Sequence, residues 1–162
     1  MKLIEAVLIT DRSISTEHYE GEIAWMREKL TALLVDIGFR YSEKTAPSVH
    51  DIFTNMETSR LVNQAEGVAR IVMCVTSGRS EDSVSRALIE HELSILHPDV
   101  FFVFATIATD DSTQAWFERL IGEHPSHDKK FGVMRDYADG SISEEFAQAT
   151  RLFIERIWGT TS

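Results

Sequence analysis

One acidic side chain is singled out by its position on a predicted amphipathic helix. Apolar residues recur at helical spacing over residues 83–96, and at 100° per residue they form an arc from Val84 to Ile89, about 140° away. Glu92 falls at about 80°, inside this arc, whereas Glu90 falls at about 240°, on the opposite face. A carboxylate that faces inward needs a partner, a ligand or a raised pKa. Glu92 is therefore the candidate catalytic carboxylate, and pairing at the helix rim is the structural alternative.

Polar loops follow three of the most apolar segments of the chain. They cover residues 11–16, 77–82 and 109–113 and are rich in Ser, Thr and Asp, and arginines add positive charge to the first two. In a parallel sheet these loops meet at the carboxyl edge, where ligands bind. Arginine beside hydroxyls and free helix-start amides can hold a phosphate or a ribose, while helix caps and solvated turns are the alternative. The predicted substrate-binding residues are Asp11, Arg12, Ser13, Ser77 and Arg79.

Several common chemistries lack their sequence signature. The chain has no G-x-x-x-x-G-K-[ST], no G-x-G-x-x-G and no G-x-S-x-G motif, which argues against P-loop, ordinary dinucleotide-binding and α/β-hydrolase sites. Its six histidines form no H-E-x-x-H pattern, and Cys74 is the only cysteine. We therefore expect no metal site, no disulfide and no resident cofactor.

Composition limits the partners further. The 162 residues carry 16 Lys and Arg against 26 Asp and Glu, so the net charge is −10, and a broad nucleic-acid footprint is not expected. No apolar run is long enough to span a membrane. Glu5 interrupts the first apolar stretch, which argues against a secretory leader. We expect a cytoplasmic protein with no membrane partner.

Strand and helix patterns alternate five times along the chain. Apolar runs predict strands at residues 3–10, 39–42, 70–77, 100–108 and 131–137. Helical spacing and capping residues predict helices at 17–37, 48–65, 83–96, from 110 to about 121, and from 141 to about 157. This alternation predicts one α/β domain over residues 1–162, with a five-stranded, mostly parallel sheet and helices on both faces.

The order of these elements resembles that of TIR (Toll/interleukin-1 receptor) domains, which have a five-stranded parallel sheet in flavodoxin-like order. The third helix of that family carries a Ser-x-Trp-Cys-x-x-Glu-Leu pattern. Glu92 and Leu93 stand at the corresponding place here, with Leu88 and Ile89 where the family has Trp-Cys. The loop at residues 11–13 corresponds to one that borders the nucleotide pocket in the family.

The resemblance implies a nucleotide N-glycosidase. In the enzymatic members the helix glutamate cleaves the nicotinamide–ribose bond of NAD, so Glu92 would be the catalytic residue of an NAD glycohydrolase-type hydrolase, with NAD as substrate. Arg12 and Ser13 would position phosphate or ribose, and Ser77 and Arg79 would line the opposite side; the alternative for Arg79 is an ion pair with Glu81. The resemblance also implies homo-oligomer formation and a role in signalling or defence.

Two other interpretations stay open. Nucleoside deoxyribosyltransferase-like domains share a similar plan and also direct a glutamate at a ribosyl anomeric carbon, so the implied chemistry is related. A non-catalytic nucleotide-sensing or protein-interaction module on the same fold is the alternative to an enzyme. In that case Trp25 and Trp116 would be candidate anchors for a partner.

Overall fold

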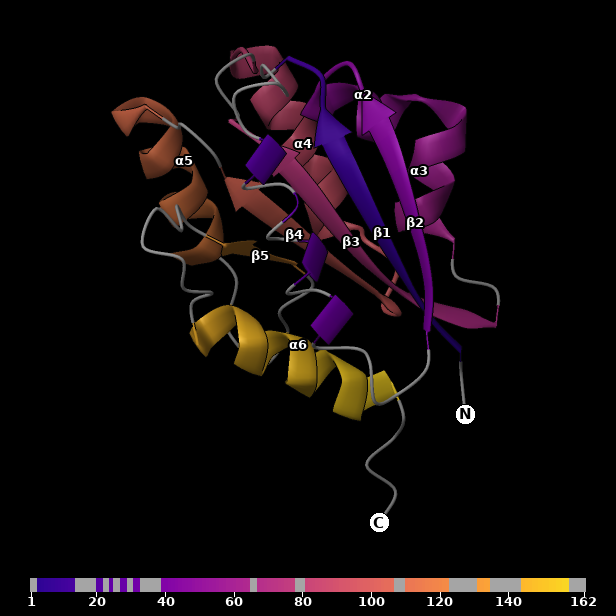
Figure 1. Ribbon diagram of the computed structural model, residues 1–162. Coiled ribbons are helices and arrows are strands. Elements are labelled where there is room, and N and C mark those ends of the chain that lie inside the picture. The colour runs from indigo at the N-terminus through magenta and orange to yellow at the C-terminus, as the bar shows by residue number, and fades with distance from the viewer. Residues whose placement is uncertain are drawn as a thin grey trace.

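Strands and helices alternate along the chain in the computed structural model, which describes residues 3–13, 20–21, 24, 27–28, 31–32, 39–64, 67–77, 81–106, 110–122, 131–134 and 144–157. The predicted α/β class is confirmed (Figure 1). The elements are β1 (Leu3–Asp11), β2 (Phe39–Ala46), α2 (Val49–Thr54), α3 (Met56–Asn63), β3 (Val68–Thr76), α4 (Ser83–Ser94), β4 (Val100–Thr106), α5 (Asp111–Gly122), β5 (Phe131–Met134) and α6 (Glu144–Ile157).

All the strand pairs in the sheet are parallel, and the strand order is β2-β1-β3-β4-β5. The prediction that the first, third and fourth strands are adjacent and parallel is confirmed, with Val7 opposite Val72 and Val72 opposite Phe102. Every residue of β4 is buried. An unbroken apolar run is the expected sequence of a strand covered on both faces.

Helices cover both faces of the sheet. Figure 1 shows α6 crossing one side, with α2, α3 and α4 on the other. On the α2–α4 side, the ring centre of Phe102 lies 5.4 Å from that of Phe53 in α2 and 4.9 Å from that of Phe104. The ring centre of Phe104 lies 5.1 Å from that of Phe117 in α5. On the α6 side, Phe101 lies 5.5 Å from Phe153. Alternate residues of β4 therefore anchor opposite layers of the core.

The predicted helix over residues 48–65 is wrong as a single element. Ser48 does cap its start, because its hydroxyl accepts from the Asp51 amide. At Asn55, however, the backbone is extended, with φ −75° and ψ 132°, and the Asn55 side chain accepts from the Glu57 amide to start a second helix. The apolar spacing continues across this break, so periodicity alone does not reveal it.

The edge strand β2 is longer than the four residues predicted. It pairs with β1 from Phe39 to Ala46, even though Glu43, Lys44 and Thr45 are polar and exposed. Such strands carry little apolar signal at a sheet edge. At the other end of the sheet, the predicted strand at 131–137 is described only for Phe131–Met134, and its remainder lies outside the described residues.

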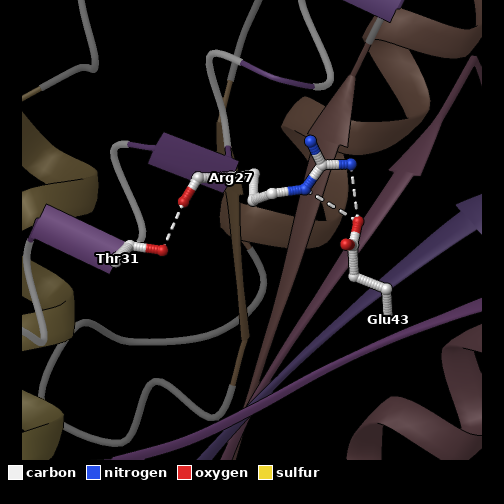
Figure 2. A network of polar contacts seen from close by, with 3 residues as sticks. All are labelled: Arg27, Thr31 and Glu43. Atoms are coloured by element: carbon white, nitrogen blue, oxygen red, sulfur yellow. Dashed lines mark hydrogen bonds and ion pairs between the residues drawn. The ribbon is translucent and has the colours of Figure 1, made fainter.

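The segment between β1 and β2 is helical at each position that the structure describes, from residue 20 to residue 32. The rest of the predicted helix at 17–37 lies outside the described residues. Figure 2 shows how this segment is tied to β2: Arg27 Nε and Nη2 both donate to Glu43 Oε1, at 2.9 and 2.7 Å. Both side chains are more than 40% exposed (42% and 43%), so the ion pair contributes at most about 1 kcal/mol.

None of the helices described is both long and apolar enough to cross a membrane.

Candidate functional site

The candidate site lies at the carboxyl edge of the sheet, between β1 and β3. From β1 the chain goes to β2 on one side, and then returns to β3 on the other. Ligands of open α/β sheets bind in the crevice outside such a reversal. Asp11 ends β1 and Thr76 ends β3, so the loops that begin with Arg12 and with Ser77 leave the sheet side by side.

Asp11 holds this edge together. It is fully buried, and its Oδ1 accepts from the Ser13 amide at 2.8 Å while its Oδ2 accepts from Thr76 Oγ1 at 2.6 Å. The Arg12 amide donates to the Ala46 carbonyl of β2 at 2.7 Å. One carboxylate therefore shapes the loop after β1 and ties it to β3, while the side chains of Arg12 and Ser13 remain exposed.

Glu81 is a second buried acid at this edge, and the sequence did not single it out. Its side chain is only 5% exposed, and Oε1 accepts from the Val49 amide at 2.9 Å and the His50 amide at 3.3 Å, at the start of α2. Burial raises the pKa of Glu81; the two amide bonds oppose this shift, and the nearby charge of Asp11 adds to it. A buried acid whose pKa is perturbed, close to a second buried acid at the carboxyl edge of a parallel sheet, is a candidate site for chemistry.

Only one feature of the sequence could have indicated Glu81. It lies in the polar loop at residues 77–82, directly before Asp82, whose side chain caps α4 by accepting from the Ser85 amide at 2.8 Å. The sequence therefore places an acid at the correct edge of the sheet. Its burial depends on α2, more than 30 residues earlier in the chain, and local patterning does not report that contact.

The raised pKa of Glu81 predicts a pH dependence of stability. The folded protein holds the Glu81 proton more tightly than the unfolded chain, so this contribution is complete below about pH 4.3 and is lost as the pH rises through the folded pKa. We expect the free energy of unfolding of the wild type to fall relative to that of Glu81→Gln over this range. Urea unfolding at pH 4 to 8 measures the difference. Glu155→Gln, at an exposed acid on α6, should follow the wild type, and parallel profiles for Glu81→Gln would contradict the prediction.

Cys74 is not a candidate nucleophile. It is completely buried in β3, and burial raises the pKa of its thiol well above the usual value, with further contributions from the charges of Asp11 and Glu81. A thiol that stays protonated is a poor nucleophile and a poor metal ligand. Among the residues described, no group of His, Cys, Asp and Glu has the arrangement of a metal site.

Glu92 is not brought together with the other predicted site residues. It is partly buried and lies in the last turn of α4, where its carbonyl accepts from the Ile95 amide. The following turn bonds to the end of α3, from the His97 amide to the Val62 carbonyl, near the amino edge of the sheet. Glu92 is nine residues beyond Ser83, which corresponds to about 14 Å along the helix axis. Asp11, Arg12, Ser13 and Ser77 lie at the opposite edge, and Arg79 lies outside the described residues.

The predicted inward arc of α4 is wrong at the end that Val84 and Ile95 occupy. Val84 is 75% exposed and Ile95 is 53% exposed, whereas Ile89 and Leu93 are buried. The buried face is therefore centred beyond Ile89, and Glu92 lies at its margin.

Glu90 does not face open solvent as predicted. Its Oε1 accepts from Trp116 Nε1 at 3.0 Å and forms an ion pair with Arg119, and both partners belong to α5. The Trp116 ring is 5% exposed and packs on Phe117, with 4.9 Å between ring centres. Trp116 is thus a core residue that joins two helices rather than an anchor for a partner, and the side chain of Trp25 lies outside the described residues.

No protein-family model, curated protein or solved structure matches the chain.

Proposed function

We propose that the protein binds a nucleotide at the carboxyl edge of β1 and β3 and cleaves its N-glycosidic bond, with NAD as the favoured substrate. The observation that carries the proposal is the pair of buried carboxylates, Asp11 and Glu81, at the reversal of strand order. Breaking the nicotinamide–ribose bond develops positive charge on the ribose carbon, and one fixed carboxylate can stabilise that charge or act as the nucleophile. The leaving group is already cationic, so it departs as neutral nicotinamide with the electron pair of the C–N bond and needs no proton. Water then adds to the ribose carbon and loses a proton to give the free hydroxyl.

In this proposal Glu81 is the catalytic carboxylate. Both of its hydrogen bonds from the α2 amides are accepted by Oε1, and we assign Oε2 to the ribose. Asp11 is a positioning residue, because it shapes the loop that presents Arg12 and Ser13 to phosphate or ribose. Ser77 and Arg79 keep the role expected from the sequence, on the opposite side of the nucleotide.

The proposal retains the resemblance to TIR domains and their flavodoxin-like sheet order for a single domain. It departs from that resemblance in the identity of the catalytic residue: Glu81 takes the role that the family gives to the helix glutamate, because Glu92 lies at the far end of α4. The same resemblance implies self-association into a homo-oligomer and a role in signalling or defence, and we keep the cytoplasmic location expected from the sequence.

A nucleotide sensor without catalysis is the second candidate. It is favoured by the observation that both oxygens of Asp11, and Oε1 of Glu81, already have protein partners. A purely structural role for the two acids would explain these bonds, and the nucleotide would then bind through the exposed loop after β1.

Incubation with NAD tests the proposal. At high protein concentration, and without added metal or reductant, we expect release of nicotinamide, measured by liquid chromatography. A concentration series detects any dependence on self-association. Calorimetry with NAD, ADP-ribose and cyclic dinucleotides runs in parallel. Binding without turnover would support the sensor, and the absence of both binding and turnover would overturn the nucleotide site.

A further inference from the structure

A pocket lies between α4 and α5. Its volume is about 400 Å³, which is within the range of small-molecule sites. It is distinct from the edge described above, because Glu81 contacts α2 whereas this pocket lies on the side of α4 that faces α5. The polar and aromatic residues that line it are Ser83, Arg86, Glu90, Ser112, Trp116 and Arg119.

Arg86 is held in position but is not fully satisfied. Its Nη2 donates to Thr113 Oγ1 at 3.1 Å, and its guanidinium carbon lies 4.9 Å from the centre of the Trp116 ring. Its Nε is buried and has no partner among the residues that the structure describes. A buried donor without a partner costs free energy. Because Nε is buried, an acceptor supplied by a ligand would remove that cost only after a shift of the Arg86 side chain.

The charges in the pocket favour an anion. Arg86 and Arg119 are positive and Glu90 is negative, which leaves one net positive charge in a protein whose overall net charge is −10. Arg119 lines the pocket, and its side chain is 58% exposed and uses Nη2 for Glu90. Ser83 and Ser112, in the first turns of α4 and α5, add hydroxyl donors where helix dipoles also favour negative charge.

We propose that this pocket binds the phosphate group of a small phosphorylated sugar. A phosphomonoester carries a charge of about −1.5 to −2 at neutral pH and three strong acceptor oxygens. A ligand with a phosphate group therefore matches two guanidinium groups better than a ligand with a single carboxylate does. The volume leaves room for an organic body beside the phosphate. One face of Trp116 is already covered by Arg86 and the ring is 5% exposed, so no ring face is offered for stacking a base. A sugar suits the remaining space.

Calorimetry with ribose 5-phosphate, inorganic phosphate and ribose tests the assignment. We expect ribose 5-phosphate to bind more tightly than either of the other two. Arg86→Gln and Arg119→Gln should each weaken its binding about tenfold or more, because each removes charge-assisted hydrogen bonds. Arg151→Gln is the matched control: it makes the same change at an exposed arginine of α6, on the opposite face of the sheet, and should bind as the wild type does.

The outcomes separate this proposal from the one for NAD. Glu81→Gln should retain ribose 5-phosphate binding, since Glu81 does not line the pocket. If Arg86→Gln fails to fold, the binding measurement on Arg119→Gln, at an exposed side chain, still tests the site. Equal affinities for ribose 5-phosphate and inorganic phosphate would overturn the assignment to a phosphorylated sugar. Unchanged binding in both arginine variants, or an equal loss in Arg151→Gln, would overturn the site.

Discussion

Glu81→Gln is expected to lower the rate of nicotinamide release by about 100- to 1,000-fold, as the loss of a preorganised electrostatic group does in other enzymes. Glutamine keeps an oxygen that can accept from the Val49 and His50 amides, so the start of α2 should stay in place. The substitution removes the negative charge that faces the developing positive charge on the ribose. The readout is the initial rate at saturating NAD, with the circular dichroism spectrum as a check on folding.

Glu92→Gln is the control for that assignment, because it makes the same chemical change at the other end of α4. We expect its rate to stay close to that of the wild type, since its last-turn position is remote from Asp11 and Ser13. Loss of activity in Glu92→Gln with full activity in Glu81→Gln would return the catalytic role to Glu92, as the family resemblance implies. Full activity in both variants would show that neither acid acts on the ribose.

Phe102→Ala is expected to lower the free energy of unfolding by about 3–5 kcal/mol, the usual cost of deleting a large aromatic side chain from a core. Phe102 is fully buried at the centre of β4, and its ring contacts both Phe53 and Phe104. Helices cover this strand on both faces, so the cavity cannot collapse without moving a whole layer. Urea denaturation followed by circular dichroism measures the change.

Leu152→Ala provides the comparison for this stability measurement. Leu152 is a large apolar residue of α6 that is 54% exposed, and surface substitutions usually change stability by less than about 0.5 kcal/mol. A loss under about 1 kcal/mol for Phe102→Ala would mean that β4 is not the centre of the core.

The elements that could be predicted from sequence are those whose signal is local. The third and fourth strands are almost unbroken apolar runs, which is the expected sequence of a short strand covered on both faces. Ser48 was identifiable as a cap because its partner, the Asp51 amide, is three residues away. The charged second half of β2 had no such signal, because its partner is the backbone of β1. The extended residue Asn55 was missed because apolar spacing continues across it.

Sequence reasoning located the part of the site whose position depends on a single strand end. Asp11 and its loop were placed at the carboxyl edge because that position follows from the end of β1. The prediction of the buried face of α4 from helical spacing was wrong in part. Apolar spacing defines an arc on the helix, but it does not define which part of that arc other helices cover. Val84 and Ile95 lie in that arc and are exposed, while Glu90, on the opposite side, is bound to α5.

The sequence by itself determined the α/β class, the adjacency of the three central strands and the edge at which polar loops gather, because each follows from apolar runs and the alternation of elements. Tertiary structure alone decided which acid is buried at that edge and which arginine is held beside Trp116. Glu81 bonds to amides 31 and 32 residues away, and Arg86 bonds to Thr113, 27 residues away. Contacts between separate elements depend on how helices pack side by side, and no local pattern of residues encodes that packing.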